Sequence, residues 1–136
     1  METVERLTIG QVAERTELSV HALRFYEREG LLANPVQRDS AGRRVYDESD
    51  VEWLNICGRL RASGMPLRAI REYAGLVRAG AGNEAARLGL LREHQERVAD
   101  QMRELAECYE LISYKVKIYE QHLANGEADQ LWSPAR

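Results

Sequence analysis

Side chains with the chemistry of DNA recognition gather in the first third of the chain. His21 and Arg24 are three residues apart, so a helix over this stretch would present both on one face. Arginine can make two hydrogen bonds to a guanine edge in the major groove, or it can bind a phosphate. Arg43 and Arg44 follow the turn-forming sequence Ser40-Ala41-Gly42. Adjacent strand residues point to opposite faces, so we expect one of these two arginines to meet the DNA backbone squarely.

Capping residues predict two short helices that would position these side chains. Thr8 begins a capping box, and the first helix is expected to end near Thr16. Ser19 is a good N-cap for a second helix that runs to about Arg28, and Gly30 suits the left-handed residue that ends a helix. Two helices joined by so short a turn form a helix-turn-helix.

The rest of the first half predicts a small wing and two more helices. Residues 31–46 contain an Asn-Pro pair and a glycine turn, a pattern typical of two short strands. Asp47 or Ser49 can cap a third helix of about 15 residues that ends at Gly64, and Pro66 stands where a fourth helix would begin. The expected fold class is all-α, a winged helix-turn-helix with a small β wing.

The predicted DNA contacts come from the second helix and the wing. The N-terminus of the helix that Ser19 caps can hold a phosphate through its backbone N–H groups. The hydroxyls of Tyr26 and Tyr46 can reach a phosphate, although the ring of Tyr46 also suits packing at the hinge of the wing. For each arginine the alternative is an ordinary solvated side chain. The predicted set is Ser19, His21, Arg24, Tyr26, Arg38, Arg43, Arg44 and Tyr46.

Composition excludes some classes of protein and does not by itself favour DNA. The net charge is −3, and residues 1–76 hold 11 Lys/Arg and 12 Asp/Glu, so a DNA site depends on where the arginines point. No run of about 18 apolar residues is present, and the first residues lack the pattern of a secretory signal. With two cysteines far apart in sequence, we expect a cytoplasmic protein without a membrane span.

A long amphipathic helix is predicted over residues 83–123. Apolar residues recur there at alternating steps of three and four, with Gln95 as the polar exception, which indicates a heptad seam. At about 1.5 Å per residue this helix is roughly 60 Å long, too long to bury its stripe against the preceding residues. We therefore predict a homodimer through a coiled coil, with an interface of Leu91, Val98, Met102, Leu105, Tyr109, Ile112, Val116 and Tyr119.

The predicted organisation is a DNA-binding head over residues 1–77, a linker over 78–82, the dimerisation helix over 83–123 and a flexible tail over 124–136. We expect no enzyme activity, because no paired carboxylates, nucleophile–base set or phosphate loop is present. Two alternatives stay open beside a regulator of promoters. One is a DNA-architectural or excisionase-like protein, which the long seam disfavours; the other is a coiled-coil adaptor whose head binds protein.

The segment from Thr8 to Leu76 resembles the DNA-binding domain of the MerR family of transcriptional regulators. The motifs that carry the similarity are TIGQVAERT, SVHALRFYEREGLL, GRRVY with DESDVEWL, and LRASGMPLRAI. The resemblance implies an antiparallel dimerisation helix and a homodimer on a palindromic promoter element. It also implies that the dimer bends and undertwists the promoter spacer so that RNA polymerase engages both promoter elements. Where the family commonly has a tyrosine before the wing arginine, this chain has Arg43.

The resemblance also bears on what signal the protein receives. Metal-sensing relatives place cysteines near the end of the dimer helix, whereas Cys108 lies mid-helix without a second thiolate nearby, so we expect no metal or cofactor. Drug-sensing relatives have a large C-terminal domain, and only 13 residues follow Leu123. One branch answers electrophiles through a single thiol in the third helix, which makes Cys57 a possible thiol sensor and an electrophile or other small molecule a possible inducer. The apolar spacing around Cys57 favours a buried core residue instead.

Overall fold

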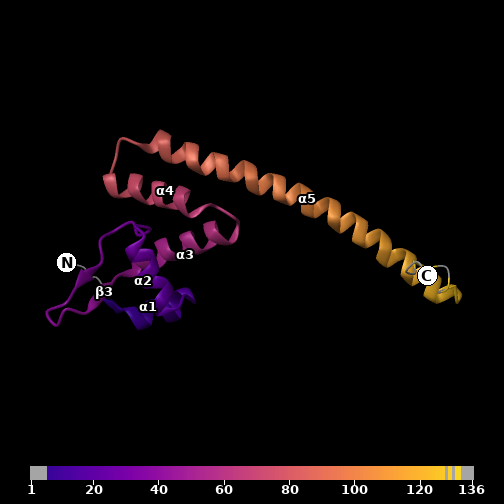
Figure 1. The fold of residues 1–136 in the computed structure, drawn as a ribbon, viewed down its shortest axis with the longest axis horizontal. Coiled ribbons are helices and arrows are strands. Elements are labelled where there is room, and N and C mark those ends of the chain that lie inside the picture. Colours follow the sequence, from indigo (N-terminus) through magenta and orange to yellow (C-terminus); the bar gives the residue numbers. More distant parts are fainter. Residues whose placement is uncertain (1–5, 128, 130, 133–136) are drawn as a thin grey trace. The chain divides into compact units, whose positions relative to one another are not determined.

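The protein is mostly helical, with one small sheet (Figure 1). The computed structural model describes residues 6–127, 129, 131 and 132, so part of the predicted tail lies outside the described residues. The chain divides into two compact units, residues 1–94 and 95–136. The elements are β1 (Leu7–Thr8), α1 (Ile9–Thr16), α2 (Val20–Arg28), β2 (Gln37–Arg38), β3 (Arg44–Tyr46), α3 (Glu48–Ala62), α4 (Leu67–Ala79) and α5 (Glu84–Asn125).

The helix-turn-helix is confirmed, with its predicted caps. Thr8 forms the capping box of α1, and the Ser19 hydroxyl accepts a hydrogen bond from the Ala22 N–H at 3.0 Å at the start of α2. Glu17, between the two helices, has a left-handed backbone with φ of 60°. A non-glycine residue is strained in this region, and it makes the sharp turn that lets α2 pack on α1.

The wing contains one strand more than the sequence predicted. The sheet has the antiparallel order β1-β3-β2, with Leu7 opposite Tyr46 and Arg38 opposite Arg44. Strands β2 and β3 form the expected hairpin. β1 was not predicted, because two residues directly before a helix cap are too few to show the alternation of a strand.

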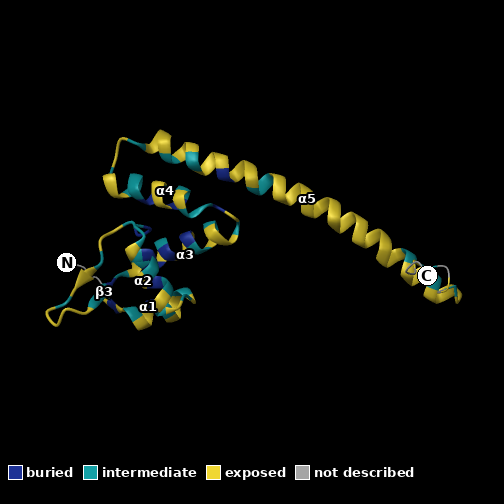
Figure 2. Cartoon of the chain, in the orientation of Figure 1, coloured by how far each residue is buried: buried dark blue, intermediate teal, exposed yellow. Residues whose placement is uncertain are grey.

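The core of the first unit draws on every helix from α1 to α4 (Figure 2). Of the two caps that the sequence allowed for α3, Asp47 and Ser49, the structure has Asp47, which forms a capping box with Asp50. The fully buried side chains include Val12, Leu23, Tyr26, Leu31, Leu54, Cys57 and Ile70. Apart from Leu31, which follows α2, these residues lie on the inner faces of the four helices, and they hold α2, the predicted recognition helix, against its neighbours.

The connection between α4 and α5 differs from the predicted linker. Helix α4 continues to Ala79, so the linker expected over residues 78–82 begins two residues too early. The Asn83 amide donates to the Leu76 carbonyl at 2.8 Å, and the Arg87 guanidinium donates to the Gly80 carbonyl at 2.6 Å. Side chains at the start of α5 therefore tie this connection to α4.

Helix α5 has 42 residues and starts and ends within two residues of the prediction. Its seam faces solvent over most of its length: Met102, Leu105, Tyr109 and Ile112 are between 60% and 72% exposed (Figure 2). Val98 is half-buried and Leu91 is 37% exposed. Such a row of exposed apolar side chains is the surface that a coiled-coil partner covers. Among the residues the structure describes, no helix is long and apolar enough to cross a membrane.

Candidate nucleic-acid interface

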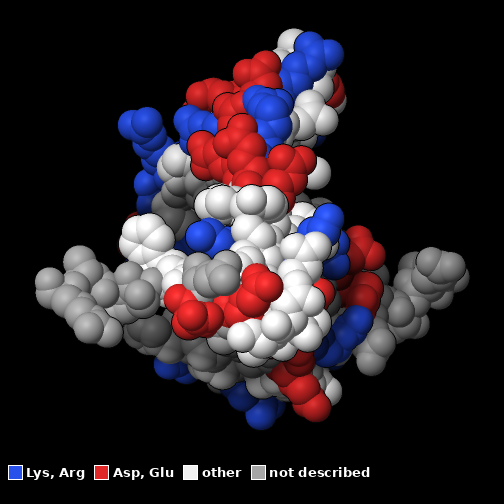
Figure 3. All heavy atoms as spheres, turned by 90° about the vertical axis from the view of Figure 1, so that its right-hand side faces the viewer, with Lys and Arg blue, Asp and Glu red and all other residues white. Residues whose placement is uncertain are grey.

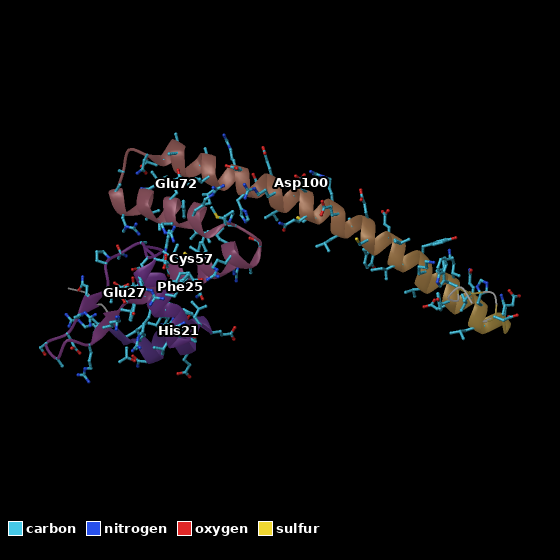
Figure 4. All side chains as sticks on the ribbon, viewed as in Figure 1. His21, Phe25, Glu27, Cys57, Glu72 and Asp100 are labelled. Carbon is cyan, nitrogen blue, oxygen red and sulfur yellow. The ribbon has the colours of Figure 1, made fainter. Side chains whose placement is uncertain are left out.

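The outer face of α2 presents polar side chains, while its inner face belongs to the core. His21, Arg24 and Arg28 are exposed, and Leu23 and Tyr26 are buried. Figure 4 shows His21 on the outer side of the head and Cys57 in its interior. Arg28, one turn beyond Arg24, was not in the predicted set; the same helical spacing that selected Arg24 also points to it.

Four arginines from α2 and the wing surround a single surface hollow. The hollow is lined by Arg24 of α2, by Arg38, Arg43 and Arg44 of the wing, and by Thr8, Ile9, Asp39, Gly42 and Val45. Acidic and basic side chains are interspersed over the face shown in Figure 3. The hollow departs from that mixture, because arginines outnumber its one carboxylate.

The adjacent wing arginines have different surroundings. The Arg44 Nε donates to the Glu27 Oε2 at 2.6 Å, and the two side chains are 26% and 28% exposed. This ion pair joins the wing to the recognition helix and neutralises much of the charge of Arg44. The Arg43 side chain is 80% exposed and makes a looser contact of 3.3 Å with Asp39. Arg43 is therefore the more available of the two for a phosphate.

The tip of the wing is held by hydrogen bonds within its own turn. One Asp39 carboxylate oxygen accepts from the N–H groups of Ala41 and Arg43 at 2.9 and 3.0 Å. The backbone N–H of Arg43 is the main cause that holds the pKa of the Asp39 carboxyl below its usual value. Gly42 takes a left-handed backbone with φ of 80°, and Arg38 donates to its carbonyl at 2.8 Å. The turn thus has its shape before any DNA arrives.

Two tyrosines of the predicted set belong to the core. Tyr26 is 1% exposed and Tyr46 is 4% exposed. Their burial argues against the predicted phosphate contacts, because Tyr26 follows Leu23 on the buried stripe of α2 and Tyr46 ends β3 pointing inward. For Tyr46 it fits the alternative of a packed ring. The spacing of the two tyrosines from other apolar residues in the sequence already indicated a core position. The Tyr46 hydroxyl is buried without a hydrogen-bond partner in the described part of the chain, and burial raises its pKa.

Cys57 is a core residue. Its thiol is fully buried, and desolvation raises its pKa to about 11. A reactive cysteine needs a thiolate, and this thiol stays protonated at neutral pH. The core alternative for Cys57 is therefore confirmed, and burial of the thiol argues against a thiol sensor. Cys108 is exposed on α5. Within residues 6–127, 129, 131 and 132, no three His, Cys, Asp or Glu side chains come together to hold a metal ion.

A recognition helix, a β wing and arginines shared between them define a winged helix-turn-helix protein that binds DNA. Comparison with known proteins makes the assignment specific. The family model described as MerR HTH family regulatory protein matches residues 7–75, and one described as MerR, DNA binding matches residues 51–112. The chain belongs to the MerR family of transcriptional regulators.

Individual relatives agree over most of the chain. An uncharacterized HTH-type transcriptional regulator of Haemophilus influenzae is 34% identical over 119 residues, which are 88% of this chain and 87% of that protein. The crystal structure of HiNmlR, a MerR family regulator lacking the sensor domain, bound to promoter DNA, matches with a TM-score of 0.80 and 32% identity, covering 96% of this chain and 98% of that one. A MerR family regulator from Listeria monocytogenes has a TM-score of 0.84 and 26% identity, covering 90% and 92% of the two chains. These likenesses support DNA-binding regulation of transcription and do not favour an adaptor or an architectural protein.

Proposed function

We propose that this regulator binds a palindromic promoter element as a homodimer, with α2 of each subunit in one major-groove half-site. The observation that carries the proposal is the hollow in which Arg24 of α2 meets the arginines of the wing. A helix lying in the major groove brings a wing against the adjacent backbone, so one surface can read bases and bind phosphates together.

The contacts divide by the position and surroundings of each side chain. Arg24 is exposed on α2 and reads a base; His21, also exposed and one turn earlier, contacts a base or a phosphate. Ser19 and the first turn of α2 hold a phosphate through backbone N–H groups. Arg38 and Arg43 bind the backbone beside the wing. Arg44 acts mainly through its ion pair with Glu27, which keeps the wing next to the recognition helix.

The seam of α5 is the proposed dimer interface. Leu105, Tyr109 and Ile112 are exposed by 68%, 72% and 60%, and an apolar surface hollow between Leu111 and Leu123 includes Ile112, Val116 and Tyr119. A second α5, packed antiparallel, covers these side chains. A two-fold symmetric dimer presents two identical reading surfaces, and so its binding site is a palindrome.

Promoter distortion is the proposed means of control. Bending a site of 20–30 base pairs by 40–90° costs about 1–6 kcal/mol, which a dimer with two anchored heads can supply from its phosphate and base contacts. We propose that the bent and undertwisted spacer lets RNA polymerase engage both promoter elements. We also propose that the protein acts in the cytoplasm, where it binds promoter DNA.

Selection of genomic fragments by the purified protein, followed by footprinting, tests this proposal. We expect enriched fragments to share a palindrome, protected symmetrically at a stoichiometry of two chains per site. End-labelled fragments should also show a shortened end-to-end distance when the protein is bound. An asymmetric footprint with one chain per site would contradict the homodimer, and an unchanged distance would contradict distortion.

A further inference from the structure

The segment that leaves the recognition helix is held by side chains from α3 and α4. Four consecutive backbone carbonyls, at residues 29–32, each accept a hydrogen bond from Arg71, Arg78 or Trp53, and the Leu31 carbonyl also accepts a long one from the Cys57 thiol at 3.9 Å. The contacts are Arg71 Nε to the Glu29 carbonyl at 2.7 Å, Arg78 Nη1 to the Gly30 carbonyl at 3.0 Å and to the Leu32 carbonyl, and Trp53 Nε1 to the Leu31 carbonyl at 2.8 Å.

These side chains are not needed to end α2. The helix is closed by its own backbone, since the Leu31 N–H donates to the Tyr26 carbonyl at 2.9 Å and the Gly30 N–H donates to the Glu27 carbonyl at 3.3 Å. Gly30 has φ of 70°, the left-handed conformation usual after a helix. The carbonyls of residues 29–32 follow the C-terminal end of α2, where the negative end of the helix dipole favours cations. What the arginines add is attachment of α2 to α4.

The hydrogen bonds to residues 29–32 have a defined geometry and link this segment to both α3 and α4. The Arg71 guanidinium binds both the carbonyl and, at 2.9 Å, the carboxylate of Glu29, a geometry that the planar fork of arginine allows and lysine does not. Trp53 of α3 stacks on Tyr73 of α4 with ring centroids 5.5 Å apart and planes 13° apart. The exit segment, α3 and α4 therefore form one cluster.

The C-terminal end of α4, which carries Arg78, is also tied to the first turn of α5. Asn83 donates to the Leu76 carbonyl at 2.8 Å, and Arg87 donates to both the Asn83 side chain at 2.7 Å and the Gly80 carbonyl at 2.6 Å. Within residues 1–94, then, α4 is held at one end to the start of the dimerisation helix and through its arginines to the end of the recognition helix.

We infer that Arg71 and Arg78 are positioning residues for promoter distortion. They fix the angle of α2 relative to α4, and this angle decides how far the DNA must bend for both recognition helices of a dimer to sit in their half-sites. The inference rests on the proposed function. Neither arginine lines the hollow that contains Arg24, so their effect on DNA passes through the orientation of α2.

The test compares the full-length wild type with Arg71→Met, Arg78→Met and the double variant, on the strongest genomic fragment recovered by selection. Arg92→Met is the matched control, because Arg92 is exposed on α5 and the substitution is the same. Affinity is measured by titration, and the bend by energy transfer between dyes at the fragment ends, at saturating protein. We expect the double variant to bind about tenfold more weakly, as the loss of a few charge-assisted hydrogen bonds allows. Its saturated complex should also be bent clearly less than that of the wild type.

A second measurement needs no DNA. Hydrogen exchange of the backbone N–H groups of residues 26–32 should quicken in the double variant, while the exchange of α1 and α3 stays as in the wild type. Arg71→Lys should recover affinity in part but not the bend, because an ammonium group cannot bind the Glu29 carbonyl and carboxylate in the same fork geometry.

The outcomes separate this inference from the proposed function. If the wild type bends its fragment and the saturated double variant bends it equally, the positioning role is refuted and the proposed function stands. If the wild type does not bend the fragment, both are refuted. If the double variant unfolds, the two single variants test the inference instead. An unchanged bend in both single variants overturns the inference. A reduced bend in either supports it, provided that Arg92→Met keeps the wild-type bend.

Discussion

Replacing Tyr46 with phenylalanine should stabilise the protein without weakening its binding to DNA. The ring of Tyr46 is packed in the core with 4% of its surface exposed, and its hydroxyl is buried with no hydrogen-bond partner among the residues that the structure describes. Burying a hydroxyl without a hydrogen bond costs about 1–3 kcal/mol. Phenylalanine keeps the ring and removes this cost, and the loss of the oxygen's packing contacts offsets part of the gain.

We therefore expect Tyr46→Phe to raise the free energy of unfolding by about 1 kcal/mol, equivalent to a rise in Tm of about 4 °C for a domain of this size. Urea and thermal unfolding at one fixed protein concentration measure it, since dimer stability depends on concentration. The pKa of Tyr46 is raised by burial above the ordinary 10.0. The unfolded chain then releases this proton more readily, so the wild type should lose stability as the pH rises above 10 and the variant should lack that part of the loss.

The reasoning is refuted if the variant is less stable than the wild type by 1 kcal/mol or more, because the hydroxyl must then have a partner. A tenfold loss of DNA affinity in a folded variant would restore Tyr46 as a phosphate ligand. Val36→Ala, at a half-buried position directly before β2 and outside the hollow, controls for general disturbance of the wing.

The remaining predictions concern the reading surface, the seam and the buried thiol. Arg24→Ala should weaken binding to the selected palindrome by about 1–3 kcal/mol and binding to random DNA much less, as measured by competition titration. Arg43→Ala should lower the slope of log affinity against log salt by about 0.9, the share of one phosphate. Arg44→Ala should change that slope less and instead lower stability by about 1 kcal/mol, because it breaks the half-buried ion pair. Ile112→Asp should give monomers in sedimentation, since it places a charge in the seam. A thiol reagent should titrate one cysteine of the native protein quickly and reach Cys57 only on unfolding.

For four of these predictions a specific outcome would contradict the reasoning. Equal losses on specific and random DNA would make Arg24 a phosphate ligand, and an unchanged salt slope for Arg43→Ala would remove Arg43 from the site. Arg92→Ala, an exposed arginine of α5, is the control for both. A stable dimer of Ile112→Asp would refute the seam, with Glu110→Asp as the matched acidic control on α5. Rapid titration of both thiols would return Cys57 to the candidates for a sensor.

Local signals in the sequence predicted most of the fold. Thr8, Ser19 and Asp47 are cap residues whose effect acts over three residues, and for that reason the starts of α1, α2 and α3 were predicted correctly. The missed strand β1 has two residues, and its pairing with β3 depends on contacts that are 37 and 39 residues apart in sequence. Local patterns hold no information on such a contact.

The candidate site was predicted less completely, because exposure and pairing are tertiary properties. A tyrosine carries both an apolar ring and a polar hydroxyl, so the types of Tyr26 and Tyr46 allowed either a surface or a core position. In the folded protein, packing against neighbouring apolar residues places both tyrosine rings in the core. Arg43 and Arg44 are the same residue type. The position of Glu27 on α2 gives Arg44 a short, half-buried ion pair, whereas Arg43 makes a looser contact with Asp39 and stays exposed.

Thr8 belongs to two elements at once, with a consequence for how the head moves. It pairs with Val45 in the sheet, and its side chain caps α1. The β2–β3 hairpin therefore does not move independently of α1. A displacement of its tip on DNA binding is coupled to the N-terminus of α1 through Thr8. Loosening of the hairpin and fraying of that helix should accordingly occur as a single event, seen as one common rate of amide exchange across both.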